Sequence, residues 1–367
     1  MIESIKFRSA LPFDENVKEE FISEIWGGAI DRWRENITPD IEARIEKEIA
    51  TFEQVEGYMA YLYFVWCVVI ESNYFIMPYR TLAHASAVCY ALGITEVDPI
   101  RLGLDFNRFM QTDNPRFAEI GLATNATKWQ IQKEIMNLDF DEYRERLGER
   151  ESDDKAPALT IYPSQRTAQL LGYFSDKVNF DYISFDDRKT FYTLLRSNDL
   201  AGVYGCNDGT VLQDYLTQAK PYFEDLIPLC ADNLPAHYVF LHRRYNIVSK
   251  TKFAPEIESI LSETCGGILY DEQVYAIAKL VGYTPSEAEA FRMVLNKHKK
   301  QEYNTHRQRF RKYKGLFSKL IKDGGWTYPK AHLAEVARLV YTTAYLKTHF
   351  PEEFTRAALC VAASEDC

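Results

Sequence analysis

The chain has 367 residues, 46% of them apolar and 14% aromatic, which is enough to bury the cores of two or three domains. This composition excludes a largely disordered chain, and the net charge of −10 excludes a protein that binds polyanions over its whole surface. The first ten residues carry no apolar run behind basic charges, so we expect no secretory signal and a cytoplasmic protein.

The N-terminal third shows helical patterns. Asp40 is placed to cap a helix from Ile41 to Val55, with isoleucines on one stripe. The more apolar stretch from Val55 to Glu71 predicts a buried helix. Its membrane-like part, Tyr58–Ile70, is 13 residues long, whereas a membrane-spanning helix needs about 20, so no membrane contact is expected. Small residues between Tyr79 and Leu92 predict a close-packed helix.

The middle of the chain is mixed. A short irregular or strand region is expected near Phe117–Thr124, and the charged run Asn137–Pro157 predicts an exposed helix end and then a linker. A helix is expected at Ser164–Phe174. Another is opened by Asp186 or Asp187.

Helical periodicity then resumes and fills most of the last third. It covers Val211–Ala219 and Glu272–Leu280, and Pro285 occupies a first-turn position before a helix over Ser286–Asn296. Seven cysteines lack a CxxC pair and seven histidines lack metal-ligand spacing. We therefore expect no disulfide framework, no metal site and no cofactor.

One segment reverses the overall charge. Residues 292–322 hold eleven Lys or Arg and one acid, Glu302. A solvated helical face is the commoner meaning of such a run. A local surface that binds the phosphates of DNA or of a nucleotide is the alternative.

Several segments resemble one protein family. Residues 266–310, written GGILYDEQVYAIAKLVGYTPSEAEAFRMVLNKHKKQEYNTHRQRF, resemble the fingers of the DNA polymerase III alpha subunit, a bacterial replicative polymerase of the C family. There, a Gly-hydrophobic-Tyr-Gln-Glu-Gln-Val helix and a Gly-Tyr turn precede Arg-Arg-Ala-Met-Gly-Lys-Lys-Lys. Residues 328–359 resemble the family's Asn-Lys-Ser-His helix and its Tyr-Pro-x-Glu-Phe segment, and residues 202–229 resemble the entry to the thumb.

Residues 61–109 resemble the entry to the palm, with a Tyr-Phe-x-x-x-Trp helix followed by Tyr-Ala-Leu-x-Ile-Thr-x-x-Asp-Pro. The resemblance implies an α+β, predominantly helical fold, a truncated and divergent C-family polymerase core with a small palm sheet and large helical fingers. It implies N-terminal helices and a reduced palm in residues 1–157. The remaining palm and a thumb-like region follow in 158–265, and the fingers in 266–367.

The family's catalytic acids are missing at the matching positions. Its Pro-Asp-Phe-Asp-x-Asp-Phe motif places two metal-binding aspartates at Gly121 and Ala123, and a small gap moves them to Ala118 and Ile120. The third acidic position falls on Ile161. Polymerases of this kind hold two magnesium ions with such carboxylates. Mg²⁺ is therefore expected only if substitutes form a site, and the candidates are Glu119, Asp105 and Asp181.

Phosphate-binding positions are only partly retained. The family's Gly-Arg-Gly-Ser loop is replaced by Tyr-Arg-Thr-Leu, and the second arginine of its fingers pair is Met293. A surface salt bridge is an equal alternative for Arg292, as is a buried or capped ring for His332. The resemblance implies phosphate or DNA contacts from Arg80, Ser86, Arg292, Lys297, Lys299, Lys300, Lys330 and His332.

Missing acids beside retained fingers predict a catalytically inactive polymerase homologue that acts in DNA replication by binding DNA, nucleotide or replisome proteins. Two alternatives remain open. One is an active, divergent nucleotidyltransferase with substitute carboxylates, and the other is a helical interaction protein that binds no nucleic acid.

Overall fold

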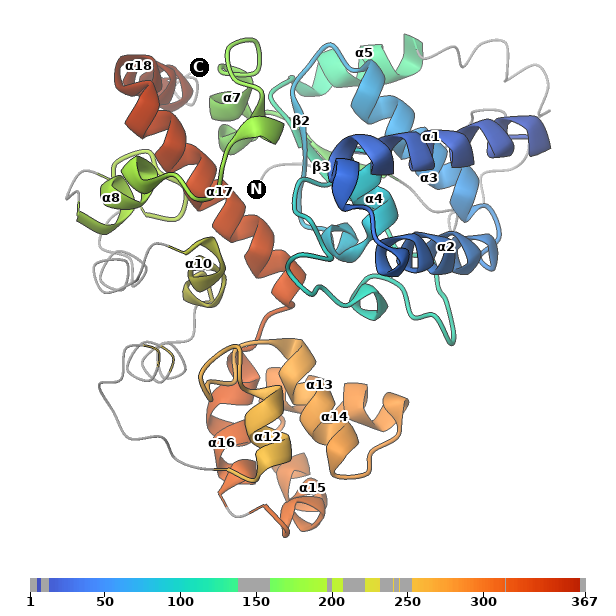
Figure 1. The fold of residues 1–367 in the computed structure, drawn as a ribbon, viewed down its shortest axis with the longest axis vertical. Coiled ribbons are helices and arrows are strands. Elements are labelled where there is room, and N and C mark those ends of the chain that lie inside the picture. The colour runs from blue at the N-terminus through green and yellow to red at the C-terminus, as the bar shows by residue number, and fades with distance from the viewer. Residues whose placement is uncertain are drawn as a thin grey trace. The chain divides into compact units, whose positions relative to one another are not determined.

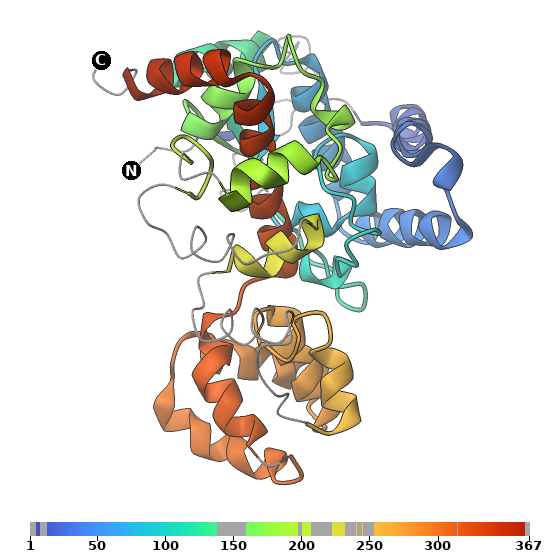
Figure 2. The same ribbon diagram turned by 60° about the vertical axis from the view of Figure 1, so that its left-hand side comes forward.

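The protein forms two compact units (Figures 1 and 2). The first contains Met1–Ile183 and Phe350–Cys367, and the second contains Ser184–His349. The predicted boundary at residue 157 lies outside the described residues, and the one at 265 lies within the second unit. A computed structural model describes residues 5–7, 13–137, 159–196, 200–206, 222–231, 240, 244, 253–313 and 315–363.

Four helices open the first unit, and they are α1 (Glu15–Trp33), α2 (Pro39–Glu53), α3 (Tyr58–Glu71) and α4 (Ala87–Ala91) (blue to cyan in Figure 1). Thr38 caps α2 by accepting a hydrogen bond from the Ile41 amide, so the predicted cap at Asp40 is wrong. α3 buries most of its side chains, which confirms the predicted buried helix. Across the described residues, no helix combines the length and apolarity needed to cross a membrane.

The helix predicted over Tyr79–Leu92 is wrong in extent. A 3₁₀ turn, η2 (Ala83–Ala85), precedes the short α4. Ser86 between them is extended and caps α4 by accepting a hydrogen bond from the Cys89 amide, so the α-helix begins only after Ser86.

A mixed sheet lies in the same unit. Its strands are β1 (Ile5–Phe7), β2 (Ile76–Pro78), β3 (Gly121–Thr124) and β4 (Leu159–Tyr162), in the order β1-β4-β3-β2. β3 and β4 are parallel, and the two outer pairs are antiparallel. All four residues of β3 are buried. The predicted strand region is confirmed as the centre of this sheet.

Among the described residues, the first unit also contains 3₁₀ turns and three further helices. The turns are η1 (Arg34–Asn36), η3 (Phe106–Arg108) and η4 (Phe180–Tyr182), and the helices are α5 (Lys128–Asn137), α7 (Arg166–Gly172) and α18 (Pro351–Ala363). α7 confirms the helix predicted at Ser164–Phe174. α18 packs against α7, and the rings of Phe174 and Phe350 lie 6.0 Å apart. The C-terminal helix is therefore part of the N-terminal unit.

In the second unit, α17 (Lys330–His349) packs against α8 (Arg188–Arg196) and α10 (Phe223–Leu229). Buried Tyr341 of α17 contacts the rings of Phe185, Phe191 and Phe223. Asp187 accepts a hydrogen bond from the Thr190 amide, which confirms it as the opening residue of α8. The helix predicted over residues 211–219 lies outside the described residues.

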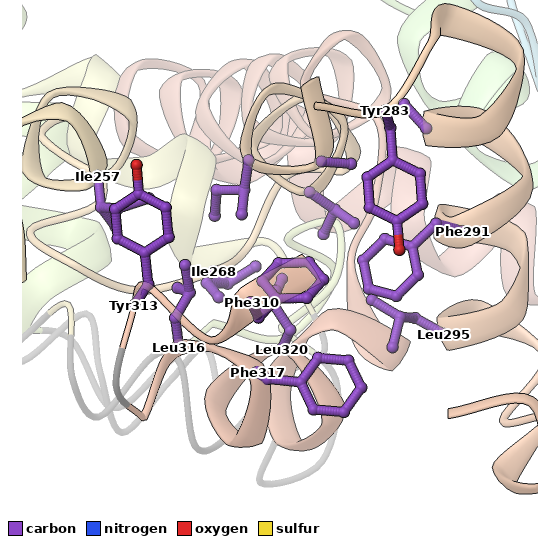
Figure 3. Packing of buried hydrophobic residues seen from close by; sticks show 14 of the residues in the cluster. Ile257, Ile268, Tyr283, Phe291, Leu295, Phe310, Tyr313, Leu316, Phe317 and Leu320 are labelled. Carbon is purple, nitrogen blue, oxygen red and sulfur yellow. The ribbon is translucent and has the colours of Figure 1, made fainter. Parts of the chain in front are cut away.

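The rest of the second unit is a helical cluster (orange in Figure 1). Its core includes Phe291, Leu295, Phe310, Phe317 and Leu320, whose side chains converge in Figure 3. The predicted helices at 272–280 and 286–296 are confirmed, and with them the predominantly helical α+β fold. The elements are α12 (Pro255–Ile260), α13 (Asp271–Leu280), α14 (Pro285–Asn296), η5 (Lys300–Glu302), α15 (Tyr303–Arg307), η6 (Gln308–Phe310), α16 (Leu316–Asp323) and η7 (Gly324–Trp326).

Candidate functional site

The register of the sheet decides which residues share its faces. Gly121 and Ala123 of β3 pair with Thr160 and Tyr162 of β4, whereas Ile161 pairs with the residue between them. Paired residues on neighbouring strands point to the same face, and successive residues point to opposite faces. Ile161 therefore lies on the face opposite to Gly121 and Ala123, so the three positions matched to family aspartates do not share one face.

The face that holds Gly121 and Ala123 is closely packed. Tyr79, directly after β2, donates its amide to the Gly121 carbonyl oxygen at 2.8 Å. A Cβ added to Gly121 would overlap the carbonyl oxygen of Tyr79, a backbone atom that cannot swing aside. Ala123 has no exposed surface. A carboxylate at Gly121 thus requires β2 and β3 to separate.

The alternative positions for the two aspartates lie in the segment before β3. Tyr58 donates its hydroxyl to the Ala118 carbonyl oxygen at 3.0 Å, and the Tyr61 hydroxyl accepts the Ile120 amide at 2.7 Å. Burial raises the pKa of Tyr61 far above neutral pH. Two protonated phenols therefore hold this segment, and Ile120 is fully buried.

Arg80 remains accessible beside this face. The rings of Tyr79 and Tyr162 lie 5.0 Å apart at a steep angle, and the Arg80 guanidinium lies 5.4 Å from each ring centroid. Arg80 is exposed and has a φ of 52°, an uncommon conformation for a residue with a side chain. Two aromatic rings thus orient an exposed cation where the family places its phosphate loop.

The three candidate substitute carboxylates do not form a metal site in the described residues, and two of them have other partners. Asp181 accepts a hydrogen bond from Arg32 at 2.6 Å, and Asp105 caps η3 through the Asn107 amide. Glu119 is exposed directly before β3. In the described part of the chain, no group of three or more His, Cys, Asp or Glu residues is arranged to hold a metal ion.

Ser86 is enclosed by protein groups. Its hydroxyl donates to the Glu48 carboxylate at 2.6 Å, and the same carboxylate accepts the Ala87 and Val88 amides and the Arg44 guanidinium. Ser86 and Glu48 are both fully buried. The expected phosphate contact from Ser86 is therefore wrong, because Glu48 already occupies the groups that would bind the anion.

Three of the expected phosphate ligands in the second unit make internal contacts. Arg292 donates to Asp271 at 2.9 Å and to Glu289 at 2.6 Å, and it is 8% exposed. Lys330 forms an ion pair with Glu263. Burial lowers the pKa of His332, so its ring is neutral at pH 7. Arg292 thus forms a salt bridge, but with Asp271 in the interior and not on the surface as the alternative expected.

The remaining ligands lie together on the surface. Lys297, Lys299 and Lys300 follow α14 and are all exposed. The His298 ring between them lies 5.1 Å from the ring of Trp326, which is 53% exposed. We call Lys297, His298, Lys299, Lys300 and Trp326 the basic edge. Its sequence signal was the lysine run, whereas nothing in the pattern singled out Trp326.

Further basic residues of the 292–322 segment are also exposed. They are Arg307, Arg309, Arg311, Lys312 and Lys322. Arg309 pairs with Glu287 at 3.1 Å and stacks on Tyr283, whereas buried Phe310 of the same segment packs in the core. The helical cluster thus carries a core of aromatic side chains on its inside and lysines and arginines on its outside.

Two domain models of one protein match this arrangement. The bacterial DNA polymerase III alpha NTPase domain matches residues 19–145, and the finger domain of the same subunit matches residues 165–314. Together they cover most of the chain. The helical fold and these matches define its class as a polymerase core of the C family. More particularly, the chain is a DNA polymerase III alpha-like protein, similar to these two domains of the bacterial subunit.

Curated relatives agree with this assignment. The chain is 33% identical over 203 residues to a DNA polymerase III subunit alpha of Rickettsia prowazekii and 32% identical over 208 residues to one of Thermus aquaticus. Each match covers 50% of this chain and 17% of the relative. A Staphylococcus epidermidis subunit is 27% identical over 194 residues, which is 48% of this chain and 18% of the relative. The chain therefore spans less than a fifth of the length of the curated relatives it matches.

Proposed function

We propose that this DNA polymerase III alpha-like protein does not catalyse nucleotidyl transfer and acts instead by binding the phosphate backbone of DNA through the helical cluster of its second unit. The observation that carries the proposal is the contrast between the packed sheet face around Gly121 and the exposed basic edge. The proposal concerns replication, the process to which the matched family belongs.

The sheet face supports the absence of transfer chemistry. Two-metal catalysis requires carboxylates that converge on both ions and hold the attacking and leaving oxygens. Gly121, Ala123 and Thr160 supply no carboxylate, and a side chain at Gly121 would overlap backbone. Asp181, a candidate substitute, is already paired with Arg32.

The basic edge supports binding. Phosphate contacts need point charges rather than exact ligand geometry, and several exposed lysines on one surface provide them. Among the described residues, Lys297 and Lys300 have no ion-pair partner, so both charges are available to an incoming anion. The overall charge of −10 limits such binding to this surface.

The decisive experiment measures binding and extension of a labelled primer-template by the purified chain, with magnesium and nucleotides, across a salt series. We expect binding that weakens steeply with salt, and no extension. A triple variant, Lys297→Gln, Lys299→Gln and Lys300→Gln, should weaken binding at least tenfold. It should also lower the salt slope by about 0.9 for each phosphate that the protein no longer neutralises.

A matched control removes three exposed positive charges that lie outside the helical cluster. Its substitutions are Lys47→Gln, Arg188→Gln and Lys189→Gln. This control should bind DNA like the unmodified chain, because it changes the net charge equally at other sites. Magnesium-dependent extension would overturn the inactive assignment and favour substitute carboxylates. Equal weakening by both triple variants would show that the basic edge has no special role, and absence of any nucleic-acid binding would favour a helical interaction protein.

A further inference from the structure

We infer that the basic edge binds an unpaired nucleobase by stacking it on Trp326, with the neighbouring lysines on the flanking phosphates. The inference rests on the proposed function and specifies the chemistry of its ligand. It predicts a preference for single-stranded over blunt duplex DNA.

The first observation is how Trp326 is presented. It ends η7, and the two glycines before it are buried. A Cβ added to Gly325 would lie 2.5 Å from Cε1 of His298 and 3.0 Å from the Leu295 carbonyl oxygen. A side chain at Gly325 would have to displace the His298 ring for this turn to approach the end of α14 so closely. The glycines thus bring the Trp326 ring to the surface beside His298.

The second observation is the charge around this ring. His298 has a φ of 50°, so the chain turns sharply there between Lys297 and Lys299. Lys299 shares its charge with Glu302 at 3.0 Å. The lysines at 297, 299 and 300 all lie within two residues of the ring that contacts Trp326.

A half-exposed indole in contact with His298, whose neighbours in the sequence include three exposed lysines, matches the chemistry of single-stranded nucleic acid. Each unpaired base offers a flat apolar face, and the phosphates on either side carry the charges that lysines bind. In a duplex these base faces are stacked on one another and are inaccessible. The structure therefore favours a ligand with at least one unstacked base next to phosphate.

Trp129 is a second exposed indole of the chain. It is 68% exposed on α5 of the first unit, with Lys133 Nζ 5.2 Å from its ring centroid. Trp129 therefore provides a matched control, an exposed indole of α5 outside the basic edge.

The test measures binding of labelled oligothymidylate, of blunt duplex DNA and of dTTP to the whole chain and to three variants. Trp326→Leu should weaken oligothymidylate binding about 5- to 100-fold, the range of one base-aromatic stack, and leave the salt slope and duplex binding unchanged. Trp326→Phe keeps a ring and should retain most of the affinity. Trp129→Leu should bind like the unmodified chain. Circular dichroism establishes that each variant is folded.

The dTTP measurement distinguishes a free nucleotide from a DNA strand as the ligand that supplies the stacked base. Binding of dTTP that Trp326→Leu weakens identifies a free nucleotide as a ligand of the stack, and binding of oligothymidylate alone identifies a strand. The inference is overturned if folded Trp326→Leu binds oligothymidylate as tightly as the unmodified chain. If the lysine triple variant still loses all binding in that case, the proposed function stands without the stack, so the two failures are distinguishable.

Discussion

The sheet of the first unit and the basic edge of the second unit differ in packing and in charge. In the sheet, positions matching catalytic acids are small or apolar and are packed against backbone, as at Gly121 and Ala123. At the basic edge, lysines and an indole remain exposed. The difference teaches that a packed strand face and an exposed charged surface place different demands on the chain, because metal-ligand geometry is strict whereas contacts by point charges are tolerant.

The largest effect is expected when an acidic residue is placed in β3, because this tests whether the sheet face is too closely packed to hold a carboxylate. Gly121→Asp should lower the free energy of unfolding by about 3 kcal/mol or more, because the new Cβ overlaps the Tyr79 carbonyl oxygen and the carboxylate is buried without a partner. Urea denaturation followed by circular dichroism measures the loss.

The control for this change is Gly27→Asp in α1, where an added Cβ meets nothing within 4 Å. It should alter the free energy of unfolding by less than about 0.5 kcal/mol. A Gly121→Asp chain as stable as the Gly27→Asp chain would show that the sheet face has room for a catalytic aspartate.

A second test separates the internal cations of the helical cluster from its exposed ones. Arg292→Met leaves the buried Asp271 carboxylate without this partner, so it should cost about 3 kcal/mol of stability. Lys299→Met breaks an exposed pair and should cost less than about 1 kcal/mol. Thermal and urea denaturation compare the two. If the folded Arg292→Met chain loses DNA affinity more than Lys299→Met does, the assignment of Arg292 to a structural role fails.

The smallest expected effect concerns the second close-packed glycine. Gly325→Ala places its Cβ against the end of the His298 ring, which can rotate, so we expect a loss of only about 1 kcal/mol. The displaced ring should change the fluorescence of Trp326 and weaken oligothymidylate binding. Gly27→Ala controls for the added methyl group. Unchanged Trp326 fluorescence would argue against glycine-dependent placement of the indole.

Much of the helical part of the fold was predictable because its signals are local. Pro285 and the apolar spacing of α14 specify that helix, and the acidic Asp187 specifies the start of α8. The extent of α4 was not predictable from its small residues. Ser86 adopts an extended conformation to cap that helix, and its hydroxyl is fixed by Glu48, which lies 38 residues away.

The site was predictable only where it depends on single exposed residues. The lysines after α14 follow from the sequence alone, but the role of Arg292 depends on Asp271, which the fold brings to it. The face to which Ile161 points depends on strand register, and an error of one residue reverses it. The association of Trp326 with the lysine run became visible only through its contact with His298, which the sequence does not indicate.

The position of α17 has a consequence for synthesis of the protein. Tyr341 donates its hydroxyl to the Ser184 carbonyl oxygen and packs against the Phe185 ring, more than 150 residues earlier in the chain. The core from Ile257 to Leu320, in contrast, is built from near neighbours. At about 5–20 residues per second, roughly 10–30 s separate the emergence of α8 from that of its partner on the ribosome. The helical cluster can therefore form first, while the exposed rings of residues 185 and 191 await α17 and are a natural target for chaperones during translation.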